Sequence, residues 1–333
     1  MPETGHRKKG LRFIIYGTGA IGGAIGGHLA LSGKDVILIG RPGQVNAIRE
    51  NGLRLVTPSG THTLRTTAVT TPGQISFQEN DVVLLTVKGQ NSEEALRDLQ
   101  AAVKDIPVLC CQNGVRNEEI ARKYFKRVYS VMVFVAGVYL TDGEIIVRRA
   151  DPPGNLIIGS YPDGKDEFVD AVAAELRDAG FLVLASPEVM DYKWGKLVLN
   201  VSNAGIAITG GSDAECQRIT DAARAEATEL LAEAGIHWLT RDEMAEKWPE
   251  INTKARGTLT GELRTSSWQS LARRQGSVES DFLNGEIVRV AEKLGKKAPV
   301  NETLVNISQE MAAKYELPGK YSVPELERRL GLG

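Results

Sequence analysis

An apolar run near the start of this chain ends in a glycine-rich turn, and this combination leaves few folds open. Residues 13–16 are all apolar, and they are followed by Gly17-Thr18-Gly19-Ala20-Ile21-Gly22. Such a run is typical of a buried parallel strand, and the glycines allow a sharp turn, a close backbone approach to an anion and the start of a helix. The helix N-terminus favours a phosphate group. The six residues of the turn are therefore candidate cofactor-binding residues for a dinucleotide.

The sequence after the turn indicates which dinucleotide. Residues 24–31 are apolar or small apart from His28, Ser32-Gly33 is a helix stop, and a second apolar run ends before Gly40-Arg41. Arg41 stands where an NAD-dependent enzyme usually carries an acidic side chain for the ribose hydroxyls. A guanidinium suits a 2′-phosphate because its planar fork matches phosphate geometry. NADP (NADPH) is therefore the expected cofactor; the alternative is a turn that binds nothing, with Arg41 as a solvated surface charge.

Length and charge bound the class of protein. A chain of 333 residues is long for one core, so two domains are expected. With 40 basic and 42 acidic side chains the net charge is −2, so neither nucleic acid nor a membrane is an expected partner. The expected partner is a small molecule. No apolar run approaches the length of a membrane span, and the N-terminus lacks the apolar core of a signal peptide. The three cysteines have no disulfide or metal-ligand spacing, which indicates a cytoplasmic protein without a metal site.

The order of the predicted elements gives the fold class. Short apolar runs alternate with helical patterns in the first half, and from about residue 187 onward long segments rich in Ala, Glu, Leu and Arg replace them. We therefore predict an α/β protein: an N-terminal Rossmann-type doubly wound parallel sheet followed by an all-helical C-terminal domain. The expected boundaries are a flexible tail at 1–10, an NADP-binding domain at 11–186 and a helical substrate and catalytic domain at 187–333, with a cleft between the two domains. The sequence leaves open whether the chain is a monomer or a homodimer.

Polar residues follow two of the predicted strands. Lys88 comes after the predicted strand 81–87, and Asn113 comes after the predicted strand 107–111. Ligands of open α/β sheets lie beyond the carboxyl ends of the strands, so both residues are expected to face the same crevice as the Gly17 turn. The alternative for either residue alone is a simple turn former.

A polar stripe marks the helix expected to open the second domain. Lys196, Asn200 and Asn203 are spaced i, i+4 and i+7, which places them on one face of a continuous helix. Burying one lysine and two asparagines is costly without partners, and the alternative is a helix that turns this stripe to water. Asparagine is a poor helix former, which weakens that alternative.

Taken together, these motifs resemble the ketopantoate reductase family, NADP-dependent reductases that pair a Rossmann domain with a helical domain. The resemblance spans nearly the whole chain. It depends on the glycine turn with Arg41, Val87-Lys88, Asn113-Gly114, Lys193-Trp194-Gly195-Lys196-Leu197 with Asn200, Ser266-Ser267, and Glu279-Ser280-Asp281-Phe282-Leu283-Asn284-Gly285.

The resemblance implies a role for each matching residue. Lys196 would be the general acid, and Glu279 would orient it or balance its charge. The binding residues would be Lys88 for the cofactor, Asn113 for nicotinamide and substrate, Asn200 and Asn203 for the polar groups of the substrate, and Ser267 for its carboxylate. Two departures from the family pattern concern the substrate. Family members often carry the second asparagine one residue later, before a proline, whereas in this chain Asn203 is followed by Ala204. The second departure is Trp268, which follows Ser267.

The expected activity is the NADPH-dependent reduction of a small 2-oxo acid. Hydride addition to a ketone builds negative charge on oxygen, and an ammonium group supplies both charge and proton. The leading expectation is 2-dehydropantoate reduced to D-pantoate, a step of pantothenate biosynthesis. The alternatives are a related reductase acting on another keto acid or an opine-type substrate, and a non-catalytic NADP sensor.

Overall fold

The computed structural model describes residues 10–259 and 265–333. These form two compact units. The first contains residues 10–112, 117–189 and 248–259, and the second contains 113–116, 190–247 and 265–333. Residues 1–9, which make up nearly all of the expected tail, lie outside the described residues.

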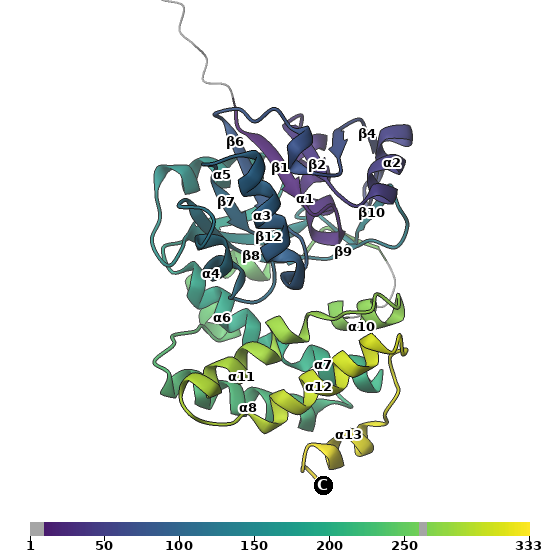
Figure 1. Cartoon of the computed structure of the whole chain (residues 1–333), viewed down its shortest axis with the longest axis vertical. Helices are drawn as coiled ribbons and strands as arrows, with labels where there is room; N and C mark the ends of the chain where they lie inside the picture. The colour runs from purple at the N-terminus through teal and green to yellow at the C-terminus, as the bar shows by residue number, and fades with distance from the viewer. Residues whose placement is uncertain (1–9, 260–264) are drawn as a thin grey trace, which may run out of the picture. The chain divides into compact units, whose positions relative to one another are not determined.

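An eight-stranded sheet forms the centre of the first unit (Figure 1). Neighbouring strands are parallel except at one pair, β8 with β12, which confirms the predicted α/β class with a mainly parallel sheet. The strands in spatial order are β13 (Leu182–Ala185), β12 (Gly154–Ser160), β8 (Val128–Val135), β7 (Val108–Cys110), β6 (Asp81–Leu85), β1 (Arg12–Tyr16), β2 (Asp35–Ile39) and β5 (Thr67–Val69).

Helices cover both faces of this sheet because its central strands are apolar on both sides. Along β1, Phe13 and Ile15 join one apolar cluster, whereas Ile14 and Tyr16 join another. This alternation follows from the two-residue period of a strand. The first cluster includes side chains of α1 (Ala20–Leu31), α2 (Pro42–Asn51) and α5 (Glu167–Asp178), and the second includes side chains of α3 (Ser92–Ala102) and α4 (Asn117–Arg122).

A second, smaller sheet explains why α1 is rich in glycine. Its strands in order are β4 (Gly60–Leu64), β3 (Leu53–Thr57), β10 (Glu144–Val147) and β9 (Gly137–Val138). A Cβ atom on Gly23 would lie 2.5 Å from Ile145 of this sheet, whereas one on Gly26 would lie 2.9 Å from Ile15 of the large sheet. Real Cβ atoms do not approach so closely, so the glycines let α1 pack between the two sheets.

The described part of the second unit is helical. Its elements are α6 (Val189–Asn200), α7 (Ser202–Thr209), α8 (Gln217–Glu233), α9 (Arg241–Lys247), α10 (Ser266–Ala272), the 3₁₀ helix η4 (Glu279–Phe282), α11 (Asn284–Lys293), α12 (Pro299–Ala313) and α13 (Val323–Arg329). One apolar cluster joins side chains from most of these helices.

One detail differs from the sequence-based expectation. The two-residue strand β14 (Gly257–Thr258) lies within the region expected to be all helical, and it pairs with β11 (Arg149–Ala150) in the first unit. Helical structure is interrupted at Leu283, between η4 and α11. Just after this break, the buried Asn284 side chain donates to the carbonyl oxygen of Val201 and to Asn301 Oδ1.

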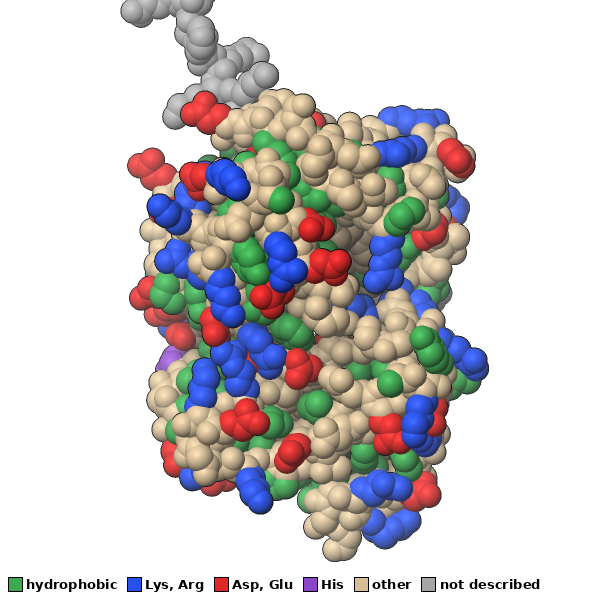
Figure 2. Space-filling model, viewed as in Figure 1, with side chains coloured by type: hydrophobic (Ala, Val, Ile, Leu, Met, Phe, Trp, Pro, Cys, Tyr) green, Lys and Arg blue, Asp and Glu red, His purple; other side chains and the backbone are tan. Residues whose placement is uncertain are grey.

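The surface shows no segregation of charge on the face drawn in Figure 2, where basic and acidic side chains are interspersed. Within the residues that the structure describes, no helix combines the length and the apolar composition that crossing a membrane requires.

Candidate functional site

Each glycine of the turn after β1 has a different surrounding. Gly17 has φ +116°, and a Cβ atom on it would lie 2.5 Å from the backbone nitrogen of Val87. A Cβ on Gly22 would lie 2.3 Å from the carbonyl oxygen of Gly17. A Cβ on Gly19, in contrast, would have no described atom within 4 Å. Gly17 and Gly22 are therefore required for packing, whereas Gly19 borders open space where a ligand can approach the backbone.

Hydrogen bonds fix this turn against two neighbouring strands. The backbone nitrogen and the hydroxyl of the buried Thr18 both donate to the carbonyl oxygen of Ile39, each at 3.0 Å. On the other side, Thr86 Oγ1 lies 3.0 Å from the carbonyl oxygen of Tyr16 and 2.9 Å from that of Gly17. Thr86 was not among the predicted site residues, because a hydroxyl at the end of a strand forms no distinctive sequence pattern.

The first turn of α1 is suited to an anion. The helix begins at Ala20, after Gly19, without a side-chain hydrogen bond at its N-cap. The N–H groups of Ala20, Ile21 and Gly22 have no acceptor within the helix, because the first turn of any α-helix leaves its donors unpaired. Such donors bind a phosphate readily.

Arg41 lies at the start of another helix. It follows the end of β2, its side chain is exposed, and its carbonyl oxygen accepts from Val45 in the first turn of α2. The guanidinium makes no hydrogen bond or ion pair with the residues that the structure describes. The Arg41 side chain therefore lies beside a helix N-terminus, and both favour an anionic group.

The ends of β6 and β7 meet beside the same turn. Lys88 directly follows Val87, which packs against Gly17, and it is the N-cap of the 3₁₀ helix η2 (Gly89–Asn91). Gln112 Nε2 donates to the carbonyl oxygen of Val87 at 2.7 Å. Lys88 therefore directly follows Val87, whose backbone packs against Gly17 on one side and is hydrogen-bonded to Gln112 on the other. Asn113, which follows Gln112 in the chain, packs with the second unit.

Lys196 and Asn113 meet within the second unit. Lys196 Nζ donates a hydrogen bond to Asn113 Oδ1 at 2.9 Å, although the two residues are 83 positions apart in the chain. Burial is the main cause that lowers the pKa of Lys196, and the positive charge of Lys193 lowers it further. The carboxylate of Glu279, on η4, opposes both effects, and the resulting pKa is about 7. The structure thus brings three predicted residues, Lys196, Asn113 and Glu279, into one electrostatic group.

Lys193 also belongs to this group, although it was not among the predicted site residues and appears above only as part of a motif. It is 3% exposed and stands three residues before Lys196 on α6. Side chains three apart on a helix are neighbours, so the spacing itself was a usable signal. The positive charge of Lys193 disfavours the charged form of Lys196.

The predicted continuous helix through Asn203 is wrong. Helix α6 ends at Asn200 and α7 begins at Ser202, so Asn203 lies on a different helix from Lys196. Side chains bind the carbonyl oxygens at this break: Ser202 Oγ donates to that of Leu199, and Asn284 Nδ2 donates to that of Val201. Such side-chain bonds compete with the helix ladder. The amide side chains of Asn200 and Asn203 are half-buried and make no hydrogen bond with other described residues.

Ser267 has an unusual environment for a hydroxyl. It is 2% exposed on α10, and its Oγ has no hydrogen-bond partner among the described residues. A buried polar group without a partner costs about 1–3 kcal/mol, so a ligand that accepts this hydrogen bond would recover the loss. The neighbouring Trp268 is partly buried and packs against the apolar cluster of the second unit.

The remaining His, Cys, Asp and Glu side chains bear on a possible metal site. Among the residues that the structure describes, no three His, Cys, Asp or Glu side chains are grouped as metal ligands. His237 Nδ1 pairs with Asp191 Oδ2 at 2.8 Å near the surface.

Comparison with known proteins gives matches over both units. The model of the family described as ketopantoate reductase PanE/ApbA matches residues 13–163, and that of its C-terminal domain matches residues 188–312. A 2-dehydropantoate 2-reductase of Pyrococcus abyssi is 29% identical over 93% of this chain and 100% of its own length. The crystal structure of a PanE/ApbA family ketopantoate reductase from Ralstonia eutropha JMP134 is 30% identical, with a TM-score of 0.74 over 92% of this chain and 99% of that one.

A further solved structure shares the fold at lower identity. It is a ternary structure of D-mandelate dehydrogenase with NADH and anilino(oxo)acetate, 20% identical, with a TM-score of 0.76 over 92% of this chain and all of that chain. At this identity the likeness concerns the fold alone.

Proposed function

Because this chain belongs to the ketopantoate reductase PanE/ApbA family of oxidoreductases, we propose that it reduces 2-dehydropantoate to D-pantoate with NADPH. Family membership confirms the resemblance inferred from the ordered motifs. The observation that carries the proposal is the hydrogen bond between Lys196 Nζ and Asn113 Oδ1, in a setting that lowers the pKa of the lysine to about 7. A lysine poised near neutral pH is suited to give up a proton during turnover.

The first unit would bind the cofactor. The open space at Gly19 and the first turn of α1 fit a pyrophosphate, and the exposed Arg41 beside the N-terminus of α2 fits the 2′-phosphate of NADPH. When bound, NADPH supplies the hydride. A D-mandelate dehydrogenase of the same fold is described with NADH, so the choice of NADPH depends on Arg41 rather than on the fold.

The second unit would supply the proton and hold the substrate. As the carbonyl carbon of the keto acid becomes tetrahedral, its oxygen gains negative charge, and the ammonium of Lys196 stabilises that charge and donates the proton. Asn113 Oδ1 orients the ammonium through the hydrogen bond already described. The orphaned hydroxyl of Ser267 would donate to the substrate carboxylate, and Asn200 and Asn203 would bind its other polar groups.

The proposal extends to where the protein works. We place it in the cytoplasm, with other enzymes of small-molecule biosynthesis. All three cysteines are among the described residues and none of them forms a disulfide, which agrees with a reducing compartment.

A substrate panel tests the proposal. The wild-type protein is mixed with NADPH and, in separate reactions, with 2-dehydropantoate, other branched or aromatic 2-oxo acids, and opine-type pairs of a keto acid and an amino acid. Oxidation of NADPH should be fastest with 2-dehydropantoate, and the product should be D-pantoate. If another acid is reduced and 2-dehydropantoate is not, the substrate assignment is wrong. If no acid is reduced while NADPH still raises the melting temperature, the protein is a non-catalytic NADP sensor.

A further inference from the structure

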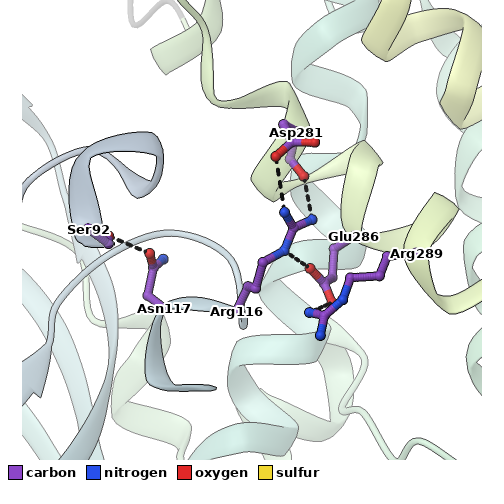
Figure 3. A network of polar contacts seen from close by, with 6 residues as sticks. All are labelled: Ser92, Arg116, Asn117, Asp281, Glu286 and Arg289. Carbon is purple, nitrogen blue, oxygen red and sulfur yellow. Dashed lines mark hydrogen bonds and ion pairs between the residues drawn. The ribbon is translucent and has the colours of Figure 1, made fainter. Parts of the chain in front are cut away.

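A four-residue segment, 113–116, packs with the second unit although the residues on both sides of it pack with the first. Both flanking residues are bound by one buried serine. Gln112 Nε2 donates to Ser92 Oγ at 2.7 Å. Ser92 Oγ in turn donates to Asn117 Oδ1, also at 2.7 Å (Figure 3). The two ends of the segment are therefore fixed to the same side chain.

Within the segment, Arg116 makes an unusually complete set of contacts (Figure 3). Its Nη1 donates to Asp281 Oδ2 at 3.0 Å, its Nη2 to the carbonyl oxygen of Asp281 at 2.9 Å, and its Nε to Glu286 Oε2 at 2.7 Å. The guanidinium also lies 4.8 Å from the centre of the Phe282 ring. A rigid fork bound at three donors fixes both the position and the orientation of a side chain.

The carboxylate of Glu286 makes this more than a surface ion pair. The Glu286 side chain is 5% exposed, and its other oxygen accepts from Arg289 Nη1 at 3.2 Å. Exposed ion pairs contribute little, whereas breaking a buried pair leaves an uncompensated charge. Replacing the ion pair between Arg116 and Glu286 by contacts with water is therefore unfavourable.

The other residues of the segment are also held. Gly114 has φ +81°, and a Cβ on it would lie 2.5 Å from the carbonyl oxygen of Phe282. Val115 is 5% exposed and belongs to the apolar cluster of the second unit. Asn113 is the residue of this segment that accepts the hydrogen bond from Lys196.

Arg116 also reaches the element that carries the second polar neighbour of Lys196. Both Asp281 and Phe282 belong to η4, which begins at Glu279. One arginine thus connects the segment that presents Asn113 with the short helix that presents Glu279.

We propose that Arg116 is a positioning residue, which holds segment 113–116 against η4 so that Asn113 and Glu279 stay in place around Lys196. This inference rests on the proposed function of Lys196 as the proton donor. It assigns a role to a side chain that the proposed function leaves without one.

Kinetics of a double-mutant cycle provide one test. Arg116→Ala should lower kcat by roughly tenfold to a hundredfold, the size of effect expected when a reacting group is misplaced by about 1 Å. Asn113→Ala should lower it too, and the loss in the double variant should be smaller than the product of the two single losses, because both changes act on the contact between Asn113 and Lys196. Arg116→Lys keeps the charge but loses the fork, so it should recover only part of the loss. Strictly multiplicative effects of the two single changes would overturn the proposal.

Arg289→Gln is the matched control. It removes the other arginine bound to Glu286 without touching segment 113–116. We expect kcat close to wild type in this variant. An equal loss in Arg289→Gln and Arg116→Ala would assign the effect to the packing of Glu286 and overturn the proposal.

A second readout requires no turnover. Acetic anhydride acylates neutral lysine, so the extent of labelling at Lys196, followed by peptide mass spectrometry against pH, gives its titration midpoint. Arg116→Ala should lower this midpoint, because the ammonium would lose both an acceptor at Asn113 and the nearby charge of Glu279. Circular dichroism checks the fold, and Arg116→Lys replaces Arg116→Ala if the latter does not fold. An unchanged midpoint in a folded variant would overturn the inference about Arg116, even if no keto acid were reduced and the proposed function failed.

Discussion

The pH dependence of turnover follows directly from the surroundings of Lys196. The pKa of this lysine is lowered to about 7, mainly by burial, and a general acid acts only in its protonated form. The ratio kcat/KM for the keto acid reports the pKa of the enzyme before the acid binds, so it should have a plateau below pH 7 and fall as pH rises through that value. At pH 8 about one tenth of the lysine is protonated, so kcat/KM should be about one tenth of its acidic plateau.

Two neighbouring charges should move this limb in opposite directions. The charge of Lys193 lowers the pKa of Lys196, so Lys193→Met should shift the limb to higher pH. The charge of Glu279 raises it, so Glu279→Gln should shift the limb to lower pH. The assay is kcat/KM for the keto acid, measured at saturating NADPH across a range of about pH 6 to 9, which spans this lysine's titration. A wild-type kcat/KM that does not fall above pH 7, or variants that shift the same way, would refute the assignment of Lys196 as the acid.

Three further predictions concern the cofactor site and stability. Arg41→Ala should weaken NADPH binding while leaving NADH binding unchanged, as measured by cofactor fluorescence titration; an unchanged preference would refute the phosphate role. Gly19→Ala should weaken cofactor binding with little change in melting temperature, whereas Gly22→Ala, whose Cβ would meet the carbonyl oxygen of Gly17, should lower the melting temperature; equal melting temperatures would contradict this. Lys196→Met should raise the melting temperature at pH 7, because the buried ammonium is unfavourable in the folded state. The gain should be largest below pH 7, where the folded protein carries the charge. It should shrink between pH 7 and about 10.5, where the lysine is protonated only in the unfolded chain. A melting temperature unchanged by Lys196→Met at every pH would contradict that reasoning.

Local patterns predicted much of the first unit. The apolar run, the glycine turn and the helix after it are β1, the turn and α1, because each depends on residues close in sequence. The small sheet was not predicted. Its strands β3 and β10 are about ninety positions apart, and nothing local indicates that they pair with each other on the far side of α1.

The candidate site shows the same limit. Lys196 and Asn113 were each chosen from motifs, but their hydrogen bond joins residues 83 positions apart. The prediction of one continuous helix from Lys196 to Asn203 was wrong, and a distant residue contributes to the break: Asn284 binds a carbonyl oxygen between α6 and α7. Arg116 gave no signal at all, since its carboxylate partners follow 165 and 170 positions later.

The most direct test of the central claim is the turnover of Lys196→Ala with 2-dehydropantoate and NADPH, measured together with its affinity for NADPH. A positioned general acid contributes roughly 10² to 10⁴ in rate, so kcat should fall by about that factor. The dissociation constant of NADPH should stay close to the wild-type value, because the residues proposed to bind its phosphate groups, the glycine turn and Arg41, belong to the first unit. Turnover equal to wild type in this variant would contradict the proposed role of Lys196.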